Sequence, residues 1–214
     1  MDINSLRIPG FTAAVSLWDG DSRRALHPPR VGPSEDGDVP GFVQIAEYDP
    51  RWPTLYEVEK QRLLTLIGNK IEAIEHFGST SIPGMCAKPC IDLIIGLRDL
   101  KVFVPLERTL SRLGYRPIAY SPDHKWRIVG RNGSVSFRLH MVPYKSHRWI
   151  GFLAMRDYLR AHQDLAFDYC RRKRKYAVLH RMDSRAYFHA KYDFVAAAEA
   201  KAHGHQAIVR LAAM

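Results

Sequence analysis

The chain has few acidic residues for its size, few cysteines and no long apolar run. Aspartate and glutamate number 22 against 32 lysines and arginines, which gives a formal net charge of +10 and an isoelectric point near 9.7. Such an excess of positive charge is typical of proteins that bind phosphate-bearing ligands, such as nucleotides, coenzyme A or nucleic acid. The charge alone does not choose among these ligands.

The three cysteines, Cys86, Cys90 and Cys170, cannot all pair with one another, which argues against the disulfide framework of a small secreted domain. No zinc-type pair accompanies Cys86 and Cys90, so we expect both as small core residues rather than metal ligands. Neither a signal peptide nor an apolar run that could span a bilayer is visible. We therefore expect a cytoplasmic protein with no membrane partner.

The length of 214 residues and the hydrophobic content of 46% fit one globular domain with a substantial core. Residues 1–40 are rich in proline and glycine, which predicts a disordered N-terminal extension. The domain is expected over residues 41–202, and residues 203–214 as a helix end or tail.

Hydrophobic periodicity predicts a mixture of helices and strands, and therefore an α+β fold. An apolar face of Trp52, Leu55, Tyr56, Leu63 and Leu66 marks the first helix. The last helix is expected to start with Ser184 as its N-cap. Strands are expected at 42–47, 71–77, 91–97, 115–120, 125–129 and 134–142, with an Asn132-Gly133 hairpin turn, and helices at 52–67, 102–113, 149–161, 164–179 and from 184 onward.

The most informative segment runs from His76 to Leu97, because it joins a strand, a glycine loop and an acid. At Gly78 and Ser79 the backbone N–H groups can turn toward an anion with no side chain intervening. Asp92 then opens an apolar run that reads as a buried strand. An acid at that place costs several kcal/mol unless a cation or hydrogen bonds compensate it, so a magnesium-bound phosphate is a natural partner.

A Gly-Ser pair about a dozen residues before an acid-bearing strand resembles the signature of the nucleotidyltransferase superfamily. Within it, the chain resembles the GrpB family over roughly residues 42–200. The matching motifs are Gly78-Ser-Thr-Ser-Ile-Pro-Gly84, Ala87-Lys-Pro89, Ile91-Asp92, Tyr48-Asp-Pro-Arg-Trp-Pro53, Arg138-Leu-His140, Met155-Arg-Asp-Tyr-Leu-Arg-Ala-His162 and Ala186-Tyr187 with Lys191.

The resemblance implies a polymerase-beta-like mixed sheet flanked by helices, with a helical C-terminal part. It also implies transfer of a nucleotidyl group from a nucleoside triphosphate, with ATP expected, to a small-molecule acceptor, or formation of an adenylate, with Mg²⁺ as cofactor. Asp92 matches the first metal-binding carboxylate, and His140 is the second candidate catalytic residue. The second carboxylate would stand two residues after Asp92, on the same face of the strand, where this chain has Ile94. The third carboxylate would fall within Arg138 to His140, where GrpB proteins have His-x-His in place of an acid and this chain has Arg138 in place of the first histidine. The carboxylate set of the implied enzyme is therefore incomplete.

The residues expected to bind substrate phosphates are those of the loop and the basic or phenolic residues of the matching motifs. They are Gly78, Ser79, Thr80, Ser81, Lys88, Arg138, Arg156, Tyr187 and Lys191. For the loop hydroxyls the alternative is a turn held by its own hydrogen bonds. For Arg156 it is an ion pair within or between helices, and for Tyr187 a place in the core.

Two other functions stay open beside nucleotidyl transfer. The chain could be a catalytically degenerate module that binds a nucleotide or a coenzyme-A-like ligand. It could also be a basic nucleic-acid-associated protein that uses the run Arg171-Arg-Lys-Arg-Lys175. Because no nucleic-acid-reading motif accompanies that run, a solvated helix face is the favoured interpretation of it.

Overall fold

The computed structural model describes residues 43–121, 124–131 and 135–212. Within these ranges one mixed sheet has the strand order β1-β2-β5-β4-β3. β2 and β5 run parallel, and the other neighbouring strands are antiparallel. The strands are β1 (Ala73–Phe77), β2 (Cys90–Leu97), β3 (Arg116–Ser121), β4 (His124–Arg131) and β5 (Val135–Pro143). The predicted α+β fold is confirmed.

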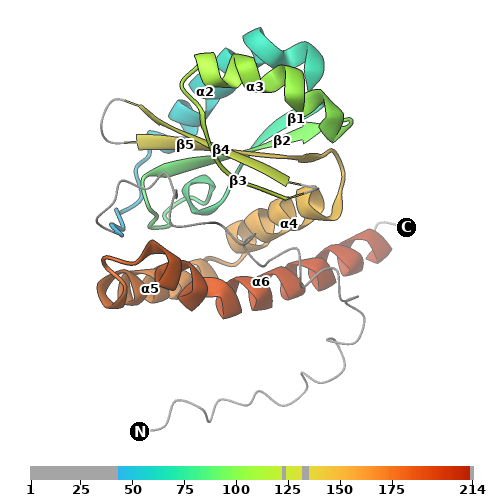
Figure 1. Cartoon of the computed structure of the whole chain (residues 1–214). Coiled ribbons are helices and arrows are strands. Elements are labelled where there is room, and N and C mark those ends of the chain that lie inside the picture. The colour runs from blue at the N-terminus through green and yellow to red at the C-terminus, as the bar shows by residue number, and fades with distance from the viewer. Residues whose placement is uncertain (1–42, 122–123, 132–134, 213–214) are drawn as a thin grey trace, which may run out of the picture. The chain divides into compact units, whose positions relative to one another are not determined.

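Helices cover both faces of this sheet. α2 and α3 lie on one face, and α4 lies on the other with α5 and α6 beyond it (Figure 1). The helices are α2 (Trp52–Ile67), α3 (Phe103–Arg112), α4 (His147–Ala161), α5 (Gln163–Leu179) and α6 (Ser184–Ala212), with short 3-10 turns η2 (Gly68–Lys70), η3 (Ser79–Ser81) and η4 (Leu100–Val102). Pro53 in the first turn of α2, and Gly114 with φ +86° just after α3, are the sequence signals that bound these helices.

β2 lies at the centre of the core and has apolar residues on both faces. Ile91, Leu93 and Ile95 pack under α2 and α3, whereas Ile94 faces the opposite side and packs with Trp149 of α4. A strand buried on both faces needs a nearly continuous apolar sequence, which is what residues 90–97 provide. Asp92 is the exception, and its side chain lies on the same face of β2 as that of Ile94.

Most predicted elements are confirmed, and three details are wrong. The expected strand at 42–47 is reduced in the described residues to one bridge, Ala46 with Ala87, because the chain pairs with the loop before β2 instead of the sheet edge. Leu66 is 46% exposed and is not part of the buried face of α2. At α6 the backbone N–H of Ala186 donates to the carboxylate of Asp183, so Asp183 is the cap instead of Ser184.

Residues 1–42 and the Asn132-Gly133 turn lie outside the described residues, so the predicted extension and hairpin turn stay predictions. No helix in the part of the chain that the structure describes combines the length and the apolar character needed to cross a membrane.

Candidate functional site

Asp92 lies on β2 next to two basic side chains of the parallel neighbour β5. Its backbone pairs with Arg138, and His140 stands two residues further on the same face. The Oδ1 atom of Asp92 is 3.3 Å from Nε2 of His140 and 3.6 Å from Nη1 of Arg138. The Asp92 side chain is 19% exposed, so the carboxylate is accessible from one side only.

These neighbours keep Asp92 ionised. Burial by itself raises the pKa of Asp92, but the hydrogen bond from His140 and the charges of Arg138 and Lys191 outweigh burial and hold that pKa below its usual range. Burial lowers the pKa of His140, which outweighs the opposing effect of Asp92. A neutral imidazole beside an ionised carboxylate hydrogen-bonds to it only as a donor, so Nε2–H of His140 donates to Asp92.

Gly78 brings the loop backbone directly against this carboxylate. Its φ of +71° lies in the region that favours glycine, and a Cβ added at Gly78 would lie 2.6 Å from Oδ2 of Asp92. No other residue type fits here without moving Asp92. The sequence pattern Gly-Ser followed by an acid-bearing strand is therefore a direct physical contact.

Two of the three loop hydroxyls, those of Thr80 and Ser81, form hydrogen bonds within the protein. Thr80 lies 3.0 Å from the Nε2 atom of His76, and Ser81 donates to the carbonyl oxygen of Gly78 at 2.6 Å. Arg160 of α4 donates twice to the carbonyl oxygen of Ser81. Thr80 and Ser81 thus hold the loop itself, whereas no described residue hydrogen-bonds the hydroxyl of Ser79.

Two lysines reach the site region around Tyr187 of α6. The Nζ atoms of Lys88 and Lys191 lie 5.1 and 4.9 Å from the centre of the Tyr187 ring. The ring is 2% exposed, so Tyr187 is a core residue that supports both amines. Because the charge of Lys191 also lowers the pKa of Asp92, α6 and β2 contribute to one electrostatic site.

The donor set does not fit a centre with two metal ions. Ile94, at the place of a second carboxylate, is fully buried against Phe77, Val142 and Trp149. Across residues 43–121, 124–131 and 135–212 no three histidine, cysteine or acidic side chains gather where a metal could bind. Asp92 is the one carboxylate here and already faces Arg138 and His140, so these donors fit one divalent ion at most.

Comparison with known proteins assigns this chain to a family. The model of the family described as GrpB protein matches residues 42–201. The chain belongs to the GrpB family. The crystal structure of conserved protein GrpB from Enterococcus faecalis has a TM-score of 0.68 and 26% identity to this chain, and the match covers 74% of this chain and 96% of that one.

Curated relatives agree with this assignment to the GrpB family. A UPF0157 protein of Halalkalibacterium halodurans is 36% identical over 135 residues, which cover 63% of this chain and 69% of the relative. Glutamate-rich protein GrpB of Alkalihalophilus pseudofirmus is 30% identical over 161 residues, which cover 72% of this chain and 92% of the relative. These names give no reaction, so the chemistry must be argued from the site.

Arg156, a motif residue of the GrpB resemblance, forms interactions that hold α4 to β1. It donates to Glu75 at 3.0 Å and to the carbonyl oxygen of His76 at 2.9 Å, and it also pairs with its neighbour Asp157. The ion-pair interpretation of Arg156 thus matches its contacts. Among the expected phosphate-binding residues, Gly78 and Arg138 lie against Asp92, and the charge of Lys191 acts on it.

The cysteines hold a bond that the sequence did not predict. Cys86, in the loop before β2, forms a disulfide with Cys170 of α5, with the Cα atoms 5.6 Å apart. Cys90 is a buried free cysteine, as expected. Cys86 is 1% exposed, as expected of a core residue, but its bond to Cys170 could not be predicted, because residues 84 positions apart in sequence meet only in the fold.

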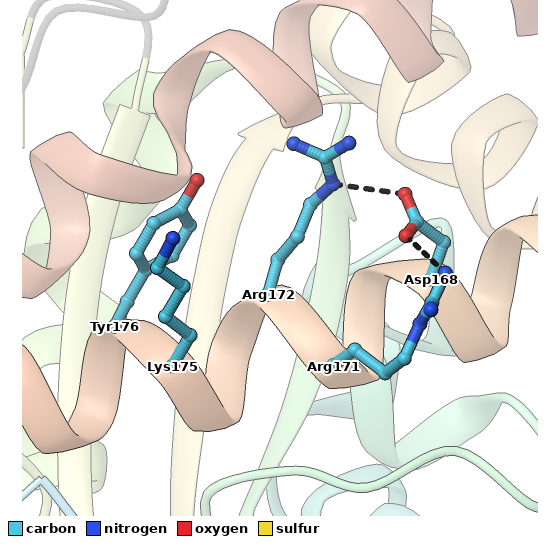
Figure 2. Close-up of a pocket in the computed structure, with 5 residues that line it drawn as sticks. All are labelled: Asp168, Arg171, Arg172, Lys175 and Tyr176. Atoms are coloured by element: carbon cyan, nitrogen blue, oxygen red, sulfur yellow. Dashed lines mark hydrogen bonds and ion pairs between the residues drawn. The ribbon is translucent and has the colours of Figure 1, made fainter. Parts of the chain in front are cut away.

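The basic run of α5 is less uniform than its sequence suggests. Lys173 is buried, and Arg174 pairs with Glu47. The other charged residues line a shallow pocket of about 280 Å³, where Asp168 binds both neighbouring arginines at 2.8 Å (Figure 2). The residues that line it are Asp168, Arg171, Arg172, Lys175 and Tyr176. Part of the positive charge is thus compensated within the helix, which fits a solvated face.

Lys173 is the functional candidate that the sequence interpretation missed. Its place in the run 171–175 groups it with charged neighbours, but it falls on the stripe of α5 whose other buried members are Ala166, Tyr169, Cys170 and Ala177. The helical period of this stripe was a signal that could have singled out Lys173.

Proposed function

We propose that the chain binds the phosphates of a nucleoside triphosphate, ATP in the first instance, and transfers its nucleotidyl group to a small-molecule acceptor. The observation that supports this function is the contact between the Gly78 backbone and the Asp92 carboxylate, in a site where Arg138 and Lys191 also act on Asp92. Backbone N–H groups and fixed cations beside one another are what a polyphosphate requires.

Each residue has a role in the proposed reaction. The backbone of Gly78 and the hydroxyl of Ser79 bind phosphate oxygens, and Lys88, Lys191 and Arg138 neutralise the charge that develops on them. The acceptor oxygen attacks the α-phosphorus, a new P–O bond forms, and the bond to the bridging oxygen breaks with release of pyrophosphate. His140, oriented by Asp92 at 3.3 Å, takes the proton of the acceptor hydroxyl.

A single Mg²⁺, when bound, would share Asp92 with the nucleotide and reduce the negative charge of the phosphates. The remaining charge stabilisation falls to the lysines and Arg138, because Ile94 supplies no ligand. Fixed side-chain cations in place of a second metal ion are the distinctive feature of this proposal.

One observation favours a second function, a module that binds a nucleotide or a coenzyme-A-like ligand without reaction. Ile94 packs in the core with Phe77 and Trp149, so an apolar core residue occupies the position of the second carboxylate. The two functions share the phosphate site and differ only in turnover.

Calorimetric titration with ATP, with and without Mg²⁺, tests the shared phosphate site. The wild type should bind ATP, and Mg²⁺ should tighten binding in the wild type but not in Asp92→Ala. Asp168→Ala removes one carboxylate from the surface of α5 and should leave both affinities unchanged. An Asp92→Ala variant that responds to Mg²⁺ as the wild type does would contradict the role of Asp92.

A further inference from the structure

Lys173 is a buried amine next to the candidate site. Its side chain lies on α5 at 2% exposure, and Nζ donates to the backbone carbonyl oxygen of Cys86. Nζ also lies 4.7 Å from the centre of the Tyr169 ring. Within the described residues no carboxylate pairs with Lys173, which is unusual because buried lysines nearly always have an acidic partner.

The electrostatic surroundings of Lys173 are positive. Burial, and then the charges of Lys191 on α6 and Arg174 on α5, lower the pKa of Lys173 well below its ordinary value. The two polar groups that face it, the Cys86 carbonyl and the Tyr169 ring, carry no full negative charge. The amine therefore lacks a counter-ion that a ligand could supply.

Lys173 and the two site lysines belong to one neighbourhood. Lys88 follows Cys86 by two residues, and Cys86 is held to α5 both by Lys173 and by its disulfide to Cys170. On the other side, burial first, and then the neighbouring Tyr187, Asp92 and Glu199, raise the pKa of Tyr169, whose ring centre lies 4.7 Å from the Lys173 Nζ. Lys173 and Lys88 are thus joined through the Cys86 segment, and Lys88 and Lys191 both lie over the Tyr187 ring.

We propose that Lys173 completes, together with Lys88 and Lys191, a three-amine subsite for the polyphosphate tail of the nucleotide. Lys173 acts from beneath the surface, where low polarity strengthens its effect on a bound anion. The ligand must then carry two or three phosphates in a row, because a monophosphate reaches the Gly78 loop alone. This inference rests on the proposed phosphate site and adds the selectivity for tail length.

The test compares Lys173→Met with Lys175→Met, the same substitution on the exposed face of the same helix. Titrations use ATP, AMP and inorganic tripolyphosphate. Lys173→Met should bind ATP and tripolyphosphate about tenfold more weakly than the wild type and AMP within about twofold, since the bound phosphates lose the charge of one protonated amine. Lys175→Met should bind all three as the wild type does.

Each outcome decides between the two proposals. Equal ATP affinity of Lys173→Met and the wild type overturns the subsite and leaves the nucleotide site intact. Tripolyphosphate that binds while ATP does not supports the subsite and contradicts a nucleotide ligand. A wild type that binds neither overturns both.

A measurement on the wild type covers the case in which Lys173→Met does not fold. At about pH 8.5, binding of ATP should draw a proton onto the buried amine, which calorimetry in buffers of different ionisation enthalpy detects. Uptake approaching one proton supports the subsite, and uptake near zero overturns it. A lysine that only holds the Cys86 carbonyl would take up no proton.

Discussion

At the scale of the residue, the contact of Gly78 with Asp92 explains why a glycine-serine pair and a distant acid form one motif. The sequence predicted both residues, but not that they touch. It also predicted three phosphate-binding hydroxyls, of which Thr80 and Ser81 instead hold the loop. A hydroxyl that serves a turn and one that serves a ligand look the same in sequence, and only their partners separate them.

Substitution of Gly78 by alanine should damage both stability and the site. The new Cβ would meet Asp92 Oδ2 at 2.6 Å, and φ is +71°. We expect a loss of roughly 3 kcal/mol or more in the free energy of unfolding, measured by denaturant titration.

Gly84→Ala is the matched control for Gly78→Ala. Its φ is also positive, at +74°, but its Cβ would meet nothing within 4 Å, so about 1 kcal/mol should be lost. Equal losses at the two glycines would show that the contact with Asp92 is not tight.

At the scale of the element, periodicity located the helices and strands well because the pattern of a two-sided core is strong in β2 and in the helices. The segment 42–47 failed because its backbone partners are non-local: Val43 donates to Arg181 and Ala46 pairs with Ala87. Ile94 could be noticed in sequence as a missing acid. Its packing against Trp149 could not, because the two residues meet through tertiary structure.

The packing of α6 contains a buried acid whose titration should be measurable. Glu199 is 5% exposed, and burial raises its pKa from 4.5 to about 7, against the opposing charge of Arg148. Because the pKa of Glu199 is higher in the folded than in the unfolded state, its protonation stabilises the folded state below pH 4.5. This contribution to the free energy of unfolding is lost as the pH rises through 7.

Glu199→Gln should therefore be more stable than the wild type at about pH 8.5, by up to about 3 kcal/mol, and similar to it at about pH 4.5. Thermal or denaturant unfolding across this range measures the difference. Asp193→Asn, an exposed change on the same helix, should give a curve parallel to the wild type. A Glu199→Gln curve that also stays parallel would contradict the burial of the carboxylate.

At the scale of the whole molecule, the Cys86–Cys170 disulfide connects the loop before β2 to α5. It closes a chain segment of 84 residues, and such a closure is worth about 4 kcal/mol through the lost freedom of the unfolded chain. The number of cysteines could not reveal this pair, since spacing in sequence does not determine which cysteines meet.

Reduction of this disulfide should lower the melting temperature by roughly 10 °C. The variant Cys86→Ser should show the same decrease without reductant and no further decrease with it. Cys90→Ser, which changes the buried free cysteine, should keep its response to reductant. An unchanged melting temperature of the wild type in reductant would contradict the presence of the Cys86–Cys170 disulfide.

The central claim is that this single-carboxylate site transfers a nucleotidyl group with the help of fixed cations. The most direct measurement is pyrophosphate release from ATP in the presence of a small-molecule fraction of a cell extract. The claim predicts release by the wild type that disappears in Asp92→Ala and falls in Lys88→Met and Lys191→Met, with Lys175→Met unaffected. Tight binding of ATP with no pyrophosphate released under any of these conditions would contradict it.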